Sequence, residues 1–323
     1  MNVDSLSVAT ERYTQGSPNK ISTDKEMTRN SKMAKILTFT LLLTSSLVGQ
    51  QQEGVWCAIM RDDGLLVPLA YFNGSGWTRQ ELPRFNTPIA MEKNWFFWPV
   101  AGSSRIIQIG TPVLIERFAQ EPGVAYVTDY CAQTTITNIF PYPKAGVALQ
   151  GKASYQRMIP ADTTQQQTEQ LLSTLVQAFR DRETLAFADT HFTTRFFGMP
   201  PSTQRRQKAI LEIQKLYRSE NSSDDKNIYY FELTRLYPYD NCFSVSMFSG
   251  WASGSPKQLT YFQEELSLGD CDGKGLGSTL EPFGLLTVQG NKYFVVDIAP
   301  YEGEWATILE WQDNQLIDIL PAQ

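Results

Sequence analysis

The stretch from Phe283 to Leu320 has the clearest strand pattern of the chain and reads FGLLTVQGNKYFVVDIAPYEGEWATILEWQDNQLIDIL. Its residues fall into four apolar runs separated by Gly, Asn, Asp and Pro: Phe283–Val288, Tyr293–Ile298, Trp305–Trp311 and Leu316–Leu320. Short runs rich in β-branched and aromatic residues, bounded by turn formers, are typical of antiparallel strands joined in sequence order. The stretch therefore predicts a four-stranded meander.

The same pattern extends over most of the chain. Near its start, Val55–Met60 and Leu65–Phe72 flank a turn at residues 62–64, and further short runs separated by Gly and Pro continue to residue 160. β-type runs return with Ile228–Tyr237 and Cys242–Phe248. We expect β-rich parts over residues 50–160 and 221–323, the second of which ends in the meander.

A helical interruption is predicted between them, over residues 161–220. Asp162 and Gln165 have the spacing of a capping box, and Leu171, Leu175 and Phe179 follow at helical spacing. A second helix is expected after Ser202, with its buried side formed by Ile210, Leu211, Ile213 and Tyr217.

Two architectures are consistent with this mainly β chain and its two-helix insertion. The first is a small β-propeller of four or five blades, in which the meander is one blade and Gly-Trp turns recur at residues 73–77, 249–251 and 302–305. The second consists of two β-sandwich or barrel-like domains that flank the helical pair.

Residues 33–49 have the pattern of a signal peptide. Lys32 and Lys35 precede the apolar run Ile36–Val48, which is shorter than the roughly 20 residues that a membrane-spanning helix needs. Residues 1–32 are polar, and we interpret them as a disordered or upstream segment ahead of a start at Met33. The sequence thus predicts an exported protein, periplasmic or extracellular, with no stable membrane span after cleavage.

The charge of the exported part disfavours polyanionic partners. Without residues 1–49 the basic residues fall from 28 to 22 and the acidic residues from 34 to 30, which gives a net charge of −8. A nucleic-acid binder needs a basic face, and an anionic membrane surface repels an acidic chain. We therefore expect neither partner.

All four cysteines follow the predicted cleavage site, so we expect two disulfide bonds in the oxidising compartment. The four residues are Cys57, Cys131, Cys242 and Cys271. The pairing that is local in sequence joins Cys57 to Cys131 and Cys242 to Cys271, and the two other connectivities stay open. Since no two cysteines are closely spaced, a zinc site is not expected.

Familiar catalytic patterns are scarce. His191 is the only histidine, and no serine has the spacing of a nucleophile elbow. Asp270 and Asp272 form a fragment of a calcium loop, but Lys274 stands where the third oxygen ligand belongs, so Ca²⁺ is a weak candidate and no other cofactor is expected. The alternative reading is a glycine-rich hairpin.

Three tryptophans at predicted turns are the candidate ligand-binding residues: Trp77, Trp251 and Trp305. Aromatic side chains presented by loops stack on sugars or anchor protein partners. We therefore expect an exported binding protein, for a glycan or protein ligand, with no catalytic centre evident.

Two other functions remain open. A carbohydrate-active hydrolase would use a carboxylate pair, with candidates at Asp297, Glu302, Glu304 and Glu310. A structural component of the cell envelope would bury all three turn tryptophans.

Overall fold

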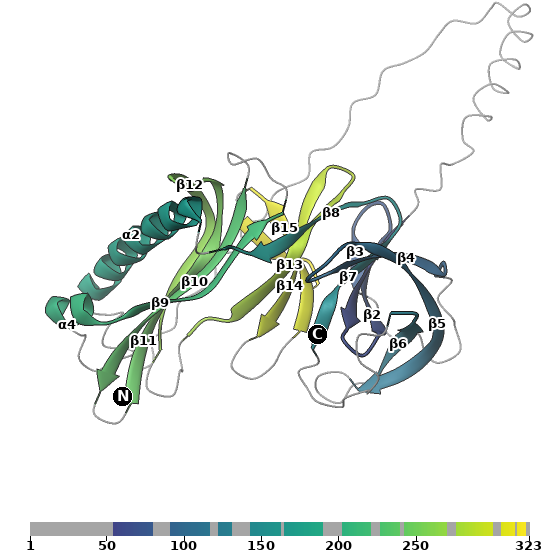
Figure 1. Ribbon diagram of the computed structural model, residues 1–323, viewed down its shortest axis with the longest axis horizontal. Helices are drawn as coiled ribbons and strands as arrows, with labels where there is room; N and C mark the ends of the chain where they lie inside the picture. The colour runs from purple at the N-terminus through teal and green to yellow at the C-terminus, as the bar shows by residue number, and fades with distance from the viewer. Residues whose placement is uncertain are drawn as a thin grey trace, which may run out of the picture. The chain divides into compact units, whose positions relative to one another are not determined.

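The structure is a computed structural model that describes residues 54–79, 91–116, 122–130, 143–162, 165–189, 202–220, 227–239, 242–269, 276–299, 305–313 and 315–320. In these ranges the chain forms two antiparallel sheets, of seven and nine strands, and two helices. Figure 1 shows the strands in sequence order from purple to yellow. Within the described ranges no helix is long and apolar enough to span a bilayer.

The first sheet closes into a barrel. Its order is β1-β7-β4-β5-β6-β2-β3, and β1 also pairs with β2, which closes a ring of six strands with β3 attached outside it. The strands are β1 (Val55–Arg61), β2 (Leu65–Phe72), β3 (Trp77–Arg79), β4 (Asn94–Pro99), β5 (Arg105–Glu116), β6 (Pro122–Thr128) and β7 (Lys144–Gln150).

Alternation along the strands explains the barrel interior. Side chains at every second position point to the same face of a strand, and Trp95 and Phe97 of β4 meet Met60, Leu66 and Ile107 in one buried cluster. The intervening residues of β1 and β7 are also buried, in a different cluster. One side of the barrel is therefore covered from outside.

The second sheet has the order β12-β11-β10-β9-β8-β13-β14-β15-β16. Strand β8 joins its two halves, because residues 154–157 pair with β13 and residues 158–160 pair with β9. The strands are β8 (Ser154–Pro160), β9 (Leu211–Ser219), β10 (Ile228–Tyr239), β11 (Cys242–Ser255), β12 (Gln258–Gly269), β13 (Thr279–Val288), β14 (Asn291–Ala299), β15 (Trp305–Gln312) and β16 (Gln315–Asp318).

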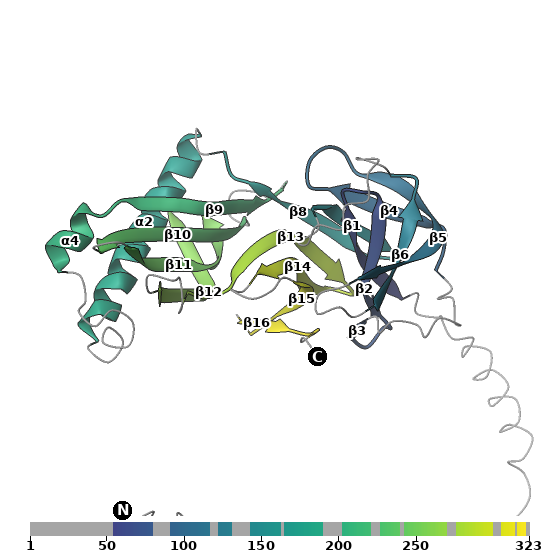
Figure 2. The ribbon, with the colours of Figure 1, turned by 90° about the horizontal axis from the view of Figure 1, so that it is seen from below.

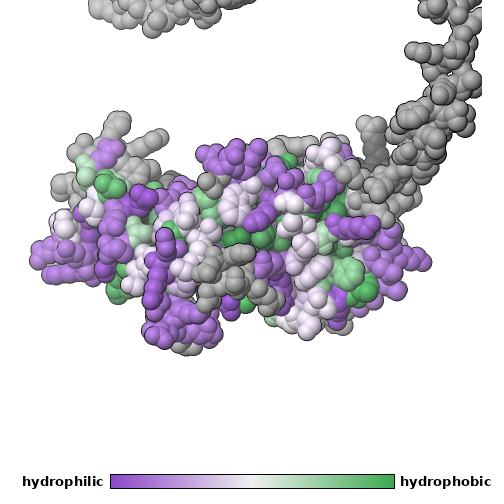
Figure 3. Space-filling model, turned by 90° about the horizontal axis from the view of Figure 1, so that it is seen from above, coloured by the Kyte–Doolittle hydropathy of each residue, from purple (hydrophilic) through white to green (hydrophobic). Residues whose placement is uncertain are grey.

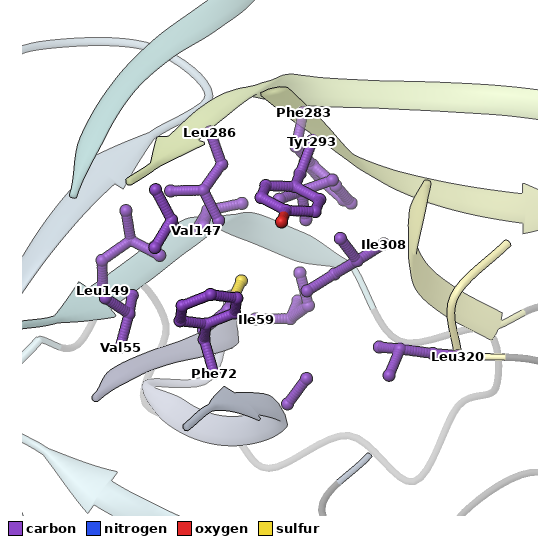
Figure 4. Packing of buried hydrophobic residues seen from close by; sticks show 14 residues of the cluster. Val55, Ile59, Phe72, Val147, Leu149, Phe283, Leu286, Tyr293, Ile308 and Leu320 are labelled. Atoms are coloured by element: carbon purple, nitrogen blue, oxygen red, sulfur yellow. The ribbon is translucent and has the colours of Figure 1, made fainter. Parts of the chain in front are cut away.

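The predicted meander is β13–β16. The central residues of β13, β14 and β15 are buried on both faces, whereas β16 alternates exposed and half-buried residues. On one face Leu286, Tyr293 and Ile308 pack against Val147 and Phe72 of the barrel (Figure 4). On the other face the neighbouring side chains of β13–β15 pack against β10, β11 and β12 in a further cluster. This double burial explains the nearly unbroken apolar runs of β13, β14 and β15, since a strand covered on both faces has no polar side.

The first predicted helix is confirmed as α2 (Gln166–Ala188). Its Leu171, Leu175 and Phe179 are buried in a cluster with side chains of β9–β12, on the opposite face from the side chains that pack against the meander. Figure 2 shows α2 crossing these strands. The second prediction is wrong over most of its length, because α4 covers only Thr203–Lys208 and the following residues form β9. Leu211–Arg218 pairs with β10 along its length, so non-local strand pairing overrides the helix-like spacing.

The mainly β fold with antiparallel meanders is confirmed, and the barrel-like alternative fits it. Separate propeller blades are not found in the described residues, because the meander continues through β8 into one nine-stranded sheet. The recurring Gly-Trp turns therefore do not mark blades.

The cysteine prediction requires a correction. Cys57 is a free thiol with no exposed surface, on β1 in the cluster between barrel and meander. The predicted bond from Cys57 to Cys131 is therefore not formed in the structure, and burial raises the pKa of the Cys57 thiol. Cys131, Cys271 and the side chain of Cys242 lie outside the described residues.

Candidate functional site

The three tryptophans predicted to bind ligand do not lie together. Trp251 lies within β11, is 1% exposed, and contacts Tyr230 and Phe294, so its predicted place at a surface turn is wrong. Trp77 is half-buried against the cluster between barrel and meander. Trp305 is half-buried at the start of β15, opposite Ile298. These residues do not form one binding surface.

Other sequence candidates fall where the structure gives no description. Asp270 and Asp272, the calcium candidates, lie outside the described residues, as do His191, Glu302 and Glu304. In the described part of the chain, no group of three His, Cys, Asp or Glu side chains is placed to hold a metal ion.

A cavity of about 320 Å³ lies where the barrel meets the second sheet. Its wall is built from the end of β4, the start of β7, and parts of β8, β9, β13 and β14. The lining side chains that matter for its chemistry are Trp98, Lys144, Tyr155, Arg157, Tyr217, Glu281, Phe283 and Asp297.

The cavity forms where the nine-stranded sheet forks. After Arg157, strand β8 leaves β13 and continues along β9, so the first residues of β13 have no strand partner on that side. Side chains take the place of the missing strand: the Lys215 ammonium donates to the Leu280 carbonyl at 2.7 Å, and the Leu280 amide donates to Glu232 at 3.0 Å. This explains why charged side chains gather in an otherwise apolar sheet.

Two carboxylates face the cavity from neighbouring strands. Glu281 of β13 and Asp297 of β14 are directly opposite each other in the strand register. Residues in that relation have Cβ atoms about 4.5–5.5 Å apart. The cavity therefore contains a close acidic pair.

Asp297 has one satisfied oxygen and one unsatisfied oxygen. Its Oδ2 forms an ion pair with the Lys144 ammonium, which joins β14 to β7 of the barrel. Its Oδ1 is buried without a hydrogen-bond partner among the described residues, and the side chain is 8% exposed. A buried carboxylate oxygen without a donor is costly, so a hydrogen-bond donor placed beside it would stabilise the folded protein.

The environments of the two carboxyls differ. Burial raises the pKa of Asp297 above 3.8, and this outweighs the opposing effect of Lys144. The Glu281 side chain is 43% exposed, accepts a hydrogen bond from the Tyr217 hydroxyl, and lies 3.5 Å from the Lys215 ammonium. Burial and the bond to Glu281 raise the pKa of Tyr217, so its hydroxyl remains a donor.

The charges around the cavity are nearly balanced. Lys144 pairs with Asp297, Arg157 with Glu220, and Lys215 lies between Glu232 and Glu281. Three cations thus face four anions, and every cation has an anionic partner. Such a cavity favours a neutral polar ligand over a strongly charged one.

Aromatic side chains form the apolar part of the wall. The rings of Trp98 and Tyr155 lie 5.2 Å apart between centroids, and Phe283 also lines the cavity. A Cβ at Gly284 would lie 2.4 Å from the Tyr155 ring, so glycine is required there for the ring to take this position. Flat apolar faces beside convergent donors and acceptors are the usual composition of a small-molecule site.

The sequence pointed to part of this site. Asp297 is the one charged residue within Tyr293–Ile298 and was already a carboxylate candidate, whereas Trp98, Lys144 and Glu281 were not singled out as site residues. Lys144 and Asp297 are 153 positions apart, so no local pattern joins them. Searches of protein-family models, curated proteins and solved structures find no match to this chain.

Proposed function

We propose that this protein is an exported binding protein that holds a saccharide ring in the cavity beside Asp297. The observation that carries the proposal is that Asp297 lines a cavity with aromatic faces and has one buried oxygen, Oδ1, without a hydrogen-bond partner among the described residues. A sugar hydroxyl is a neutral donor that satisfies this oxygen.

The rest of the cavity matches the chemistry of a sugar. A pyranose has an apolar C–H face, which stacks on aromatic rings such as Trp98 and Tyr155, and a rim of hydroxyls that both donate and accept. The ammonium of Lys144 is a donor. Glu281 is a second acceptor, and the Tyr217 oxygen is another, since its hydrogen is donated to Glu281. The cavity volume of about 320 Å³ is suited to one ring or two.

Calorimetric titration with a panel of methyl glycosides tests the proposal. At least one glycoside should bind the wild-type chain, and Trp98→Ala should weaken it at least about tenfold, because one well-packed aromatic contact is worth more than 1 kcal/mol. Trp305→Ala is the matched control and should leave the affinity unchanged. A panel without any binder, or equal losses in both variants, would refute the proposed site.

Glycoside hydrolysis is a second candidate, which the facing pair Glu281 and Asp297 favours. Retaining glycosidases use two carboxyls about 5–5.5 Å apart, one with a raised pKa as acid and one ionised as nucleophile. Asp297, buried and with a raised pKa, fits the acid, and Glu281, held by Tyr217, fits the nucleophile.

Release of 4-nitrophenol from nitrophenyl glycosides distinguishes catalysis from binding. If the pair is catalytic, Glu281→Gln and Asp297→Asn should each abolish turnover, whereas Glu310→Gln on β15 should not. No turnover by the wild-type chain with a glycoside that binds would leave binding as the function.

Export is part of the proposal and rests on the apolar segment 36–48. Amino-terminal sequencing of the protein recovered from the periplasm or medium should show a new terminus near residue 50. Recovery of the uncleaved chain in the cytoplasm would contradict it.

A further inference from the structure

An apolar strip is exposed on the barrel next to the cavity. We define the apolar strip as Phe96, Trp98, Val100 and Ile106, which lie on or next to β4 and β5. Phe96 is 54% exposed, Val100 48% and Ile106 59%. The surface seen from above in Figure 3 is mostly polar with separate apolar groups. Exposed apolar residues that cluster on such a surface mark a contact site.

The apolar strip is continuous with the cavity. Trp98 and Val100 belong to both, since they also line the cavity wall. The rings of Phe96 and Trp98 are in contact, with centroids 5.9 Å apart. Ile106 lies directly opposite Phe96 in the register of β4 and β5. A ligand in the cavity therefore has an unbroken apolar path out of it.

The length of this path sets the kind of group that fits. Phe96 and Val100 are four residues apart, which corresponds to about 13 Å at the rise of an extended chain. Their side chains, with those of Trp98 and Ile106, form a narrow band one or two strands wide. Such a band accommodates one alkyl chain rather than a broad protein surface.

We propose, building on the saccharide site, that the ligand is an amphiphilic glycoside whose sugar occupies the cavity and whose alkyl or acyl chain lies on the apolar strip. The proposal is for a single glycolipid molecule and not for a bilayer surface. The exported chain carries a net charge of −8, which opposes approach to an anionic membrane. Continuity of the strip with the cavity selects a ligand in which both parts are covalently joined.

A pair of probes with the same sugar tests the inference. The methyl and octyl forms of one glycoside that binds are titrated calorimetrically, with the octyl form below its critical micelle concentration. Each buried methylene strengthens binding about fourfold, so the octyl form should bind at least about tenfold more tightly. The double variant Phe96→Ser, Ile106→Ser removes the outer half of the strip, so it should weaken octyl binding at least about fourfold and leave methyl binding unchanged.

Leu185→Ser, which replaces a leucine that is 64% exposed on α2, is the control for general loss of surface apolarity. It should leave both affinities unchanged. Equal affinity of the methyl and octyl forms for the wild-type chain overturns this inference but leaves the sugar site. Octyl binding that Asp297→Asn does not weaken, with no methyl glycoside bound, overturns the sugar site as well.

Discussion

Among the single residues, Asp297 contributes most to the chemistry of the cavity. It lies in a strand buried on both faces, and only one of its oxygens has a partner among the described residues. A residue that satisfied only the fold would be apolar at this position, as its neighbours Val295 and Val296 are. The free energy of unfolding should therefore depend on whether this carboxyl is present.

The pH dependence of folding isolates the effect of Asp297. Its pKa is raised by burial above 3.8, so the folded protein retains a proton that the unfolded chain has already released. The stability that the protonated carboxyl contributes is therefore lost as the pH rises from 3.8 through the pKa of Asp297 in the folded protein. Urea unfolding from about pH 4 to about pH 7 should show the wild-type chain losing stability relative to Asp297→Asn. A difference between the two proteins that does not vary with pH would contradict the shift.

Gly284 is a cavity-side residue at which the addition of a single methyl group should destabilise the protein. In Gly284→Ala the new methyl would meet the Tyr155 ring at 2.4 Å and the Gln156 carbonyl at 2.7 Å. Overpacking of this kind typically lowers the free energy of unfolding by about 1–3 kcal/mol. Gly76→Ala is the control, because no atom lies within 4 Å of its added Cβ. Chemical denaturation of both variants measures the difference, and equal stability would show that Tyr155 is not held as described.

At the scale of elements, helix α2 is fixed to the sheet by a buried polar cluster. Glu183 accepts hydrogen bonds from Arg235, Tyr237 and Ser246, the last at 2.6 Å. All four side chains are buried. Since removal of one partner leaves a buried charge uncompensated, the cluster fixes how α2 lies on β10 and β11.

Glu183→Gln should therefore destabilise the protein by about 3–5 kcal/mol, because Arg235 would keep its charge without an anionic partner. Glu169→Gln on the exposed side of the same helix should change stability by no more than about 0.5 kcal/mol. Thermal or urea unfolding followed by circular dichroism compares the two. A loss below about 1 kcal/mol for Glu183→Gln would mean that the charge of the cluster is not needed.

The elements also show what could be read from the sequence and why the rest could not. Helix α2 was predictable because its buried residues, Leu171, Leu175 and Phe179, lie on one stripe within one segment. Strand β9 was not, since it is held by pairing with β10, whereas the spacing of the apolar residues at 210–217 favoured a helix. The ion pair between Lys144 and Asp297 could not be predicted for the same reason, because it forms only where the two sheets meet.

At the scale of the whole molecule, the barrel and the second sheet share one core. Val55, Cys57, Val147 and Leu149 of the barrel pack with Leu286 of the meander, and their cluster is buried. Neither the barrel nor the second sheet can exclude water from this apolar surface without the other. The described parts of the chain should therefore unfold together.

Leu286→Ala tests this coupling. It should lower stability by about 2–5 kcal/mol and shift one common transition, whether unfolding is followed by tryptophan fluorescence or by the circular dichroism of α2. Leu185→Ala on the exposed face of α2 is the control and should leave the midpoint in place. Two separate transitions, with only one moved by Leu286→Ala, would show that barrel and second sheet fold independently.

The most direct test of the account is a crystal structure of the protein soaked with the methyl glycoside that binds. We expect a sugar ring in the cavity, stacked on Trp98, with one hydroxyl within hydrogen-bond distance of Asp297 Oδ1. A cavity that contains only water around Asp297, with the glycoside bound elsewhere, would contradict it.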